Sequence, residues 1–157
     1  TLVEPWARLY RDSSTLESGV AFVHLGGLLA AGGFAVAADR GTLRAFSAGP
    51  ERRRTHLDDL AAVHRPVLIG LTVVMISGLL MLAADLEPLA TSITFWIKMG
   101  LVALLLGNGL GLTRTEQRLR QDPDSSRGWT MLRRLSAVSL TLWFAVTLAG
   151  TLLTNAS

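Results

Sequence analysis

The sequence predicts an all-α integral membrane protein: a four-helix up-down bundle with a short interfacial helix at its N-terminus. Half of the 157 residues are hydrophobic, and the mean hydropathy is +0.41. Only 17% are charged, and these charges cluster between four long apolar stretches. Each stretch is close to the roughly 20 residues that a helix needs to cross about 30 Å of hydrocarbon. The length suits one domain, which we place at residues 1–157.

The first element expected is a short helix over residues 4–16, EPWARLYRDSSTL. Pro5 can open a helix, because the missing N–H costs little in a first turn. Trp6, Leu9 and Tyr10 would then share one face. This spacing indicates a helix that lies on the outer leaflet. The alternative is a frayed tail.

Four transmembrane helices follow, at about residues 18–38, 62–84, 91–113 and 133–154. The first run, from Glu17 to Asp39, encloses 21 uncharged residues. The runs are continuously apolar, without the alternation of a membrane β-strand, and therefore favour helices.

Local residues support these boundaries. Pro66 is expected in the first turn of the second span, and Thr91 and Ser92 can cap the third. Trp129 is expected near a membrane interface, where amphipathic rings are common. Trp143 falls in the middle of the fourth span, where we expect it to pack.

Basic residues predict the orientation. Twelve arginines lie in the two connections that join the first span to the second and the third to the fourth, against two in the N-terminal segment. Such an excess marks cytoplasmic loops. We expect the termini to be periplasmic, in a bacterial inner membrane, and read Thr1 as the start of a near-complete mature chain. Residues 114–121 should extend the third helix beyond the membrane, and residues 122–126 should form a turn.

His24 is the first candidate site residue, because ionisable side chains inside a membrane are functional candidates by default. It lies about six residues into the first span, roughly 9 Å below the outer boundary. Its helix face continues through Gly27, Ala31 and Ala35, small residues that let another helix approach. His24 could therefore ligate haem iron or another metal, or contact a quinone. Alternatively it hydrogen-bonds a neighbouring helix.

Lys98 and Asn108 are candidates for cofactor binding in the third span. Lys98 should lie near the height of His24, and either snorkels outward or binds an anionic group such as a haem propionate or a lipid phosphate. Asn108 lies among Gly107, Gly109 and Gly111, which suggests close helix approach or the edge of a ligand. Alternatively it bonds a neighbouring backbone.

His64 is a further candidate at the inner end of the second span. One haem held by both His24 and His64 is disfavoured, because their expected separation approaches about 20 Å. His64 is otherwise a solvated interfacial residue beside Arg65. We expect His56 to lie on a solvated helix face.

Several functional classes are excluded. The chain has no cysteine, which rules out disulfides, thiolate metal sites and cysteine catalysis. The basic residues flank membrane spans, so nucleic acid is not an expected partner. No phosphate loop, dinucleotide fingerprint or catalytic triad pattern is present, and we expect no enzyme. No carboxylate pair lies within the predicted spans, which disfavours a carboxylate proton relay.

Three strings, VHLGGLLAAGG, ISGLLMLAAD and FWIKMGLVALLLGNGLGLTR, resemble the copper-resistance-D-like domain and related small four-helix membrane families. In those families the third span similarly carries a lysine after an aromatic residue and ends on a basic residue, here Lys98 and Arg114. The last span, with Arg133 and Arg134, is also similar. The resemblance covers about residues 18–155 and implies a cytochrome-b561-like four-helix bundle.

Three functions remain open. The first is a non-catalytic subunit of a larger respiratory or photosynthetic-type membrane complex, in contact with the lipid bilayer and other subunits and helping to hold a lipid or pigment. The second is an electron-transfer protein with haem b or a quinone at His24. The third is copper-resistance-D-like metal transport.

Overall fold

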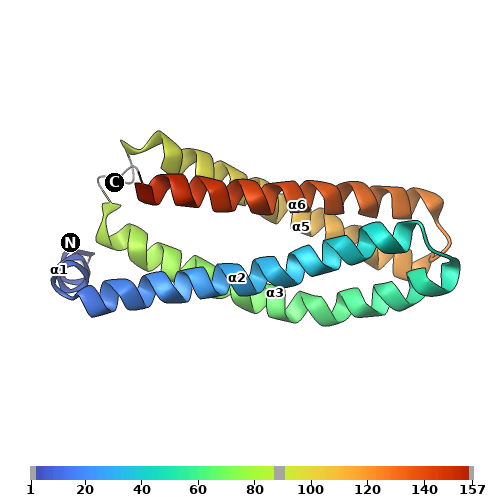
Figure 1. Cartoon of the computed structure of the whole chain (residues 1–157), viewed down its shortest axis with the longest axis horizontal. Helices are drawn as coiled ribbons and strands as arrows, with labels where there is room; N and C mark the ends of the chain where they lie inside the picture. The colour runs from blue at the N-terminus through green and yellow to red at the C-terminus, as the bar shows by residue number, and fades with distance from the viewer. Residues whose placement is uncertain (1–2, 87–90, 156–157) are drawn as a thin grey trace.

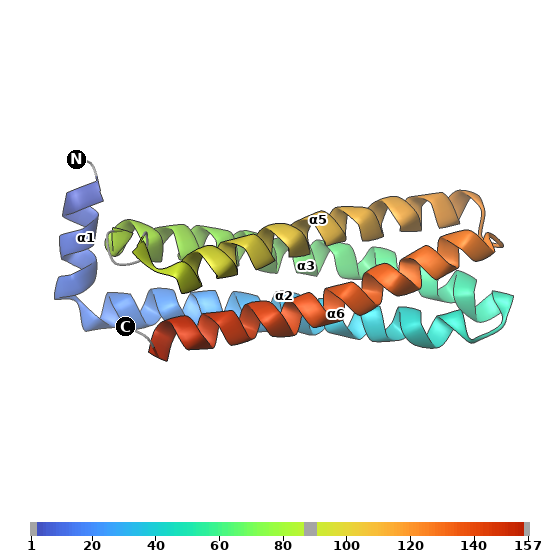
Figure 2. The same cartoon turned by 90° about the horizontal axis from the view of Figure 1, so that it is seen from above.

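The computed structural model describes residues 3–86 and 91–155, with side chains up to residue 152. The described part is almost entirely helical. Four long helices run side by side, with a short helix across one end (Figures 1 and 2). In chain order the helices are α1 (Val3–Asp12), α2 (Ser14–Phe46), α3 (Pro50–Ala84), α5 (Ile93–Gln121) and α6 (Ser126–Asn155).

The four long helices are each long and apolar enough to cross a membrane. Their outer faces carry large apolar side chains, and those of Phe22, Leu29 and Phe144 are each more than two-thirds exposed. A soluble protein rarely exposes so much contiguous apolar surface. These features support an integral membrane protein whose four transmembrane helices contact lipid.

The bundle consists of two helix pairs. α2 packs mainly against α3, and α5 mainly against α6, while α2 and α6 join the pairs. The backbones of α3 and α5 approach each other little, and side chains connect these two helices. The turns between α2 and α3 and between α5 and α6 lie at one end, which we call the Arg-rich end; α1 lies at the other, the α1 end (Figure 1).

Small residues bring α2 and α3 together, as the sequence predicted. A Cβ added at Gly70 would lie 2.8 Å from the Cβ of Ala31, and one at Gly27 would lie 3.2 Å from the Gly70 carbonyl oxygen. Neither position has room for a larger side chain. The face that runs from Gly27 to Ala31 is therefore the contact between these two helices.

Capping residues set several helix ends. Ser13 precedes α2 and its Oγ accepts a hydrogen bond from the Leu16 N–H, at 3.3 Å. Ser92 caps α5 in the same way, as predicted. The extension of the third span over residues 114–121 and the turn that follows it are both confirmed.

The connection between α2 and α3 is much shorter than the sequence suggested. It comprises residues 47–49, because α2 continues to Phe46 and α3 starts at Pro50. The placement of Pro66 in a first turn is therefore wrong: Pro66 lies inside α3, where it removes one backbone hydrogen bond. Pro50 occupies the favoured position at the start of the helix instead.

α1 lies crosswise over the end of the bundle (Figure 2). The Trp6 Nε1 donates to the Leu80 carbonyl oxygen at 2.9 Å, and Arg11 donates to the Ala84 carbonyl oxygen at 3.2 Å. Tyr10 is buried against this end of the bundle. The predicted helix over residues 4–16 is thus two helices that meet at Ser13, and Leu9 lies exposed, away from the buried face.

Trp129 and Trp143 are both core residues. Trp143 packs in the middle of the bundle, as expected. Trp129 is fully buried at the Arg-rich end, where its Nε1 donates to the Pro123 carbonyl oxygen and Arg53 stacks on its ring. The protein covers the Trp129 ring, so it does not face lipid, and its height near a membrane interface stays a prediction.

Candidate functional site

His24 lies between α2 and α3 toward the α1 end. Its Nδ1 is 3.0 Å from the Ser77 Oγ, and that hydroxyl donates its proton to the Val73 carbonyl oxygen at 2.6 Å. Ser77 therefore accepts a hydrogen bond from the His24 Nδ1–H. This arrangement leaves the lone pair on Nε2, which is the nitrogen that a metal would bind.

Lys98 lies at the same level as His24. Its Nζ lies 3.7 Å from the position that a Cβ of Gly150 would occupy, and Trp143 of the same helix packs against Gly32 of α2. The side chain is partly buried beside α6. The structure thus brings His24 and Lys98 to one level of the bundle.

Asn108 joins α5 to α6. Its Nδ2 donates to the Leu135 carbonyl oxygen at 3.1 Å. This bond matches the alternative expected from the sequence, a contact with a neighbouring backbone. The Asn108 side-chain amide therefore helps to hold α5 against α6.

His64 contacts Glu116 of α5 and lies apart from His24. The His64 Nε2 is 3.3 Å from a Glu116 carboxylate oxygen. His24 bonds to Ser77, which lies about 20 Å further along α3 than His64. The two histidines cannot ligate one haem, in agreement with the sequence argument.

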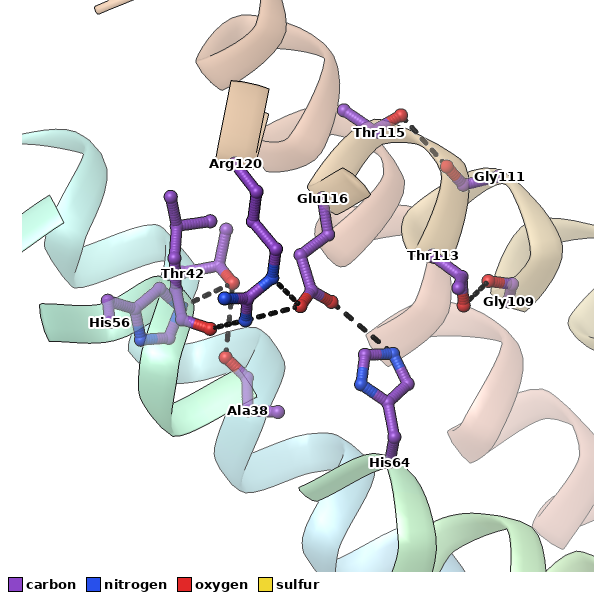
Figure 3. A network of polar contacts seen from close by, with 11 residues as sticks. Ala38, Thr42, His56, His64, Gly109, Gly111, Thr113, Thr115, Glu116 and Arg120 are labelled. Atoms are coloured by element: carbon purple, nitrogen blue, oxygen red, sulfur yellow. Dashed lines mark hydrogen bonds and ion pairs between the residues drawn. The ribbon is translucent and has the colours of Figure 1, made fainter. Parts of the chain in front are cut away.

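Glu116 is the centre of a polar network near the Arg-rich end (Figure 3). Its side chain is only 6% exposed. The Arg120 guanidinium donates to it from Nε and Nη2, at 3.1 and 2.9 Å, and also donates to the Leu57 carbonyl oxygen. Arg120 also reaches Asp58, at 3.5 Å. The network therefore ties α5 to α3 and offsets the charge of a buried carboxylate.

His56 belongs to the same end of the bundle. It is 8% exposed, and its Nε2 lies 2.8 Å from the Thr42 Oγ1 (Figure 3). Thr42 in turn donates to the Ala38 carbonyl oxygen at 3.2 Å. The expectation of a solvated His56 is wrong, because α3 begins early enough to pack this residue against α2.

A cavity of about 390 Å³ lies between α2, α3, α5 and α6. Its walls are mainly leucine and valine, and its polar groups include Asp39, His64, Glu116, Ser136 and Ser139. Volumes of about 300–1,000 Å³ with apolar walls and a few polar groups are typical of small-molecule sites. This cavity is the strongest candidate site in the part of the chain that the structure describes.

The sequence contained a signal for this cavity. The helix face that runs from His24 through Gly27, Ala31 and Ala35 reaches Asp39 four residues later. Asp39 ended the first apolar run and was therefore placed outside the span. It is 4% exposed, because α2 continues past it and α6 covers it.

Metal ligands do not gather in this structure: among the residues described, no three His, Asp or Glu side chains form a group that could hold a metal ion. A metal at His24 would need ligands from elsewhere. No family model, curated protein or solved structure matches this chain.

Proposed function

We propose that this protein is a non-catalytic integral membrane subunit that packs against partner helices in a larger respiratory or photosynthetic-type complex. The observation that supports it is a pair of exposed small-residue stripes. The first stripe lies on α2 and the second on α5; their residues are Gly26, Ala30 and Gly33, and Gly100, Ala103 and Gly107.

The glycines of these stripes pack against no other described part of the chain. A Cβ added at any of their four glycines would meet nothing within 4 Å. By contrast, a Cβ added at Gly27 or Gly70 would collide with atoms of the facing helix, because α2 and α3 pack together there. Small exposed residues allow a second helix to approach closely in lipid, where helix association depends on packing. Glycine inside a helix otherwise costs stability, so a partner helix gives these positions a role.

The proposal includes an orientation. The Arg-rich end would face the cytoplasm of a bacterial cell, and α1 would lie at the outer leaflet of the inner membrane with the termini in the periplasm. The excess of arginine at one end of the bundle supports this orientation. The exposed Leu9 on α1, 58% accessible, would enter the interface.

The test is the double variant Gly26→Leu with Gly33→Leu, expressed at native level. Native gel electrophoresis of mildly solubilised membranes should show wild-type chain in a larger complex and the variant as free chain. The double variant should keep its helical circular dichroism, because both positions face open space.

Leu25→Phe is the matched control, since it adds bulk at an exposed α2 position outside the stripe. It should leave the complex intact. Migration of the wild-type chain as a monomer, with no co-purifying partner, would contradict the subunit proposal.

A second candidate function is electron transfer with haem b or a quinone at the level of His24 and Lys98. The support is the bond from the His24 Nδ1–H to Ser77, which orients the ring and leaves Nε2 as a ligand. Reduced-minus-oxidised absorption spectra should show haem bands that His24→Ala abolishes and His64→Ala retains. Purified protein without a Soret band would rule out the haem version.

A further inference from the structure

The cavity near the Arg-rich end contains a carboxylate without a counter-charge. Asp39 is 4% exposed and lines this cavity. Ser136 and Ser139 lie near its carboxylate, but neither Asp39 Oδ2 nor the fully buried Ser136 Oγ has a hydrogen-bond partner among the described residues. Buried polar groups are nearly always paired. The two serine hydroxyls can hydrogen-bond the carboxylate but cannot neutralise it, so the partner it lacks is a positive charge.

Two arginines at this end of the bundle contact other groups. Arg120 binds Glu116 and Asp58, while Arg53 donates to the Phe46 carbonyl oxygen and stacks on Trp129. No ion pair joins any described basic residue to Asp39. An isolated buried charge is strongly unfavourable, so a cation from outside the chain would be stabilised there.

The second carboxylate in the cavity differs from Asp39 in this respect. Glu116 is held by Arg120 and contacts His64. Its charge is therefore already compensated within the bundle. Asp39 is therefore the carboxylate available to a ligand. A ligand that carries a positive charge and hydrogen-bond donors would bind it most strongly.

The rest of the cavity suits an apolar body. Most of its walls are aliphatic, with Leu71 and Leu105 among them. Leu68 and Leu110 line it from α3 and α5, and both are at least 60% exposed. Because these two lining residues are also exposed, the cavity reaches the apolar surface of the bundle between α3 and α5. A ligand dissolved in the bilayer could enter by this route.

We propose that this cavity binds a small lipophilic amine, with the protonated amino group on Asp39 and the apolar body between α3 and α5. Its N–H donors would supply the partners that Asp39 Oδ2 and Ser136 Oγ lack. A volume of about 390 Å³ suits a small amphiphile and is too small for a transmembrane helix. The binding site does not depend on whether the chain has partner subunits.

Octylammonium is a suitable probe, and calorimetric titration into nanodiscs of the purified chain measures its affinity. Empty nanodiscs correct for partitioning into lipid. We expect saturable binding to wild-type chain that Asp39→Asn weakens about tenfold or more, the usual range for a hydrogen bond to a charged group. Asp59→Asn removes an exposed carboxylate of α3 and should not change the affinity.

A second pair of variants tests the cavity without changing charge. Gly109 lines the cavity, and a Cβ there meets nothing within 4 Å, so Gly109→Leu should fill the space and weaken binding about tenfold. Gly19→Leu makes the same change at an open, exposed position of α2 outside the lining. It should bind octylammonium like the wild type.

Three results would overturn the proposal. The first is heat no greater than that of empty nanodiscs. The second is equal affinity in the Asp39→Asn chain when circular dichroism shows it folded. The third is octanol binding as tightly as octylammonium, which would show that the cavity recognises the apolar body without a cation.

Discussion

Two kinds of buried polar side chain coexist in this bundle. Glu116 and His56 each have partners from the protein, Arg120 and Thr42. Asp39 has an oxygen with none in the described part of the chain. The first kind connects helices and stabilises the fold, because a satisfied buried network costs little. The second kind is expected where a ligand completes the hydrogen bonds.

Tyr10 permits a direct measurement at one residue, since it is the chain's single tyrosine. Burial raises the pKa of Tyr10, and the nearby carboxylates Glu17 and Asp85 raise it further. We predict that tyrosinate absorbance rises with a midpoint above the usual value of about 10. Because the pKa is raised in the folded state, Tyr10 contributes its full stabilisation below the unfolded-state pKa of about 10. This stabilisation is lost as the pH rises through the folded-state pKa.

Glu17→Gln should lower this midpoint, because it removes a negative charge that acts on Tyr10. Glu51→Gln removes a carboxylate from the start of α3, at the opposite end of the bundle, and should leave the midpoint unchanged. A wild-type midpoint at or below about 10 would show that α1 does not bury Tyr10 against the bundle.

The contact between α2 and α3 leaves no room for a side chain at Gly70. At Gly70 an added Cβ would lie 2.8 Å from the Ala31 Cβ and 3.1 Å from the Gly27 carbonyl oxygen. These atoms belong to a backbone and a short side chain, so neither can rotate away. The two helices would have to separate to admit even a methyl group.

We predict that Gly70→Ala lowers the free energy of unfolding by about 1–3 kcal/mol, the usual cost of overpacking. Unfolding in mixed micelles with increasing dodecyl sulfate measures this change. Gly100→Ala is the matched control, because nothing lies near its added Cβ. It should be neutral or slightly stabilising, since alanine favours a helix. Equal effects of the two substitutions would contradict the close contact at Gly70.

The helices α2 and α3 are longer than the spans predicted from the sequence. The predicted spans stop at charged residues, yet α2 runs through Asp39 to Phe46 and α3 begins at Pro50. The extra turns bury Leu57 and His56 against α2. Tertiary packing therefore keeps helical a segment that hydropathy alone assigns to a loop.

The orientation of the whole molecule can be tested with single cysteines, because the natural chain has none. Ser47→Cys and Ser126→Cys lie at the Arg-rich end, and Asp12→Cys lies in α1; all three positions are exposed. We predict that an impermeant maleimide labels only Asp12→Cys in intact cells after removal of the outer membrane. Inside-out vesicles should reverse this pattern. Labelling of all three from one side would contradict four crossings.

Several features of this protein follow from the sequence alone. The number of spans, the Arg-rich end, the Ser92 cap and the shared level of His24 and Lys98 were predicted correctly. Each depends on residues near one another in the chain, since hydropathy, charge runs and helical spacing are local properties. The contact face from Gly27 to Ala31 was also predictable, because small residues recur there at helical spacing.

The cavity depends on the tertiary structure. Asp39 and Glu116 lie just beyond apolar runs, and charge counting therefore placed both outside the spans. They line one cavity because the helices extend past the apolar segments, α6 covers Asp39, and the backbones of α3 and α5 approach each other little. Burial of a side chain is determined by the neighbouring helices, and those neighbours are distant in sequence.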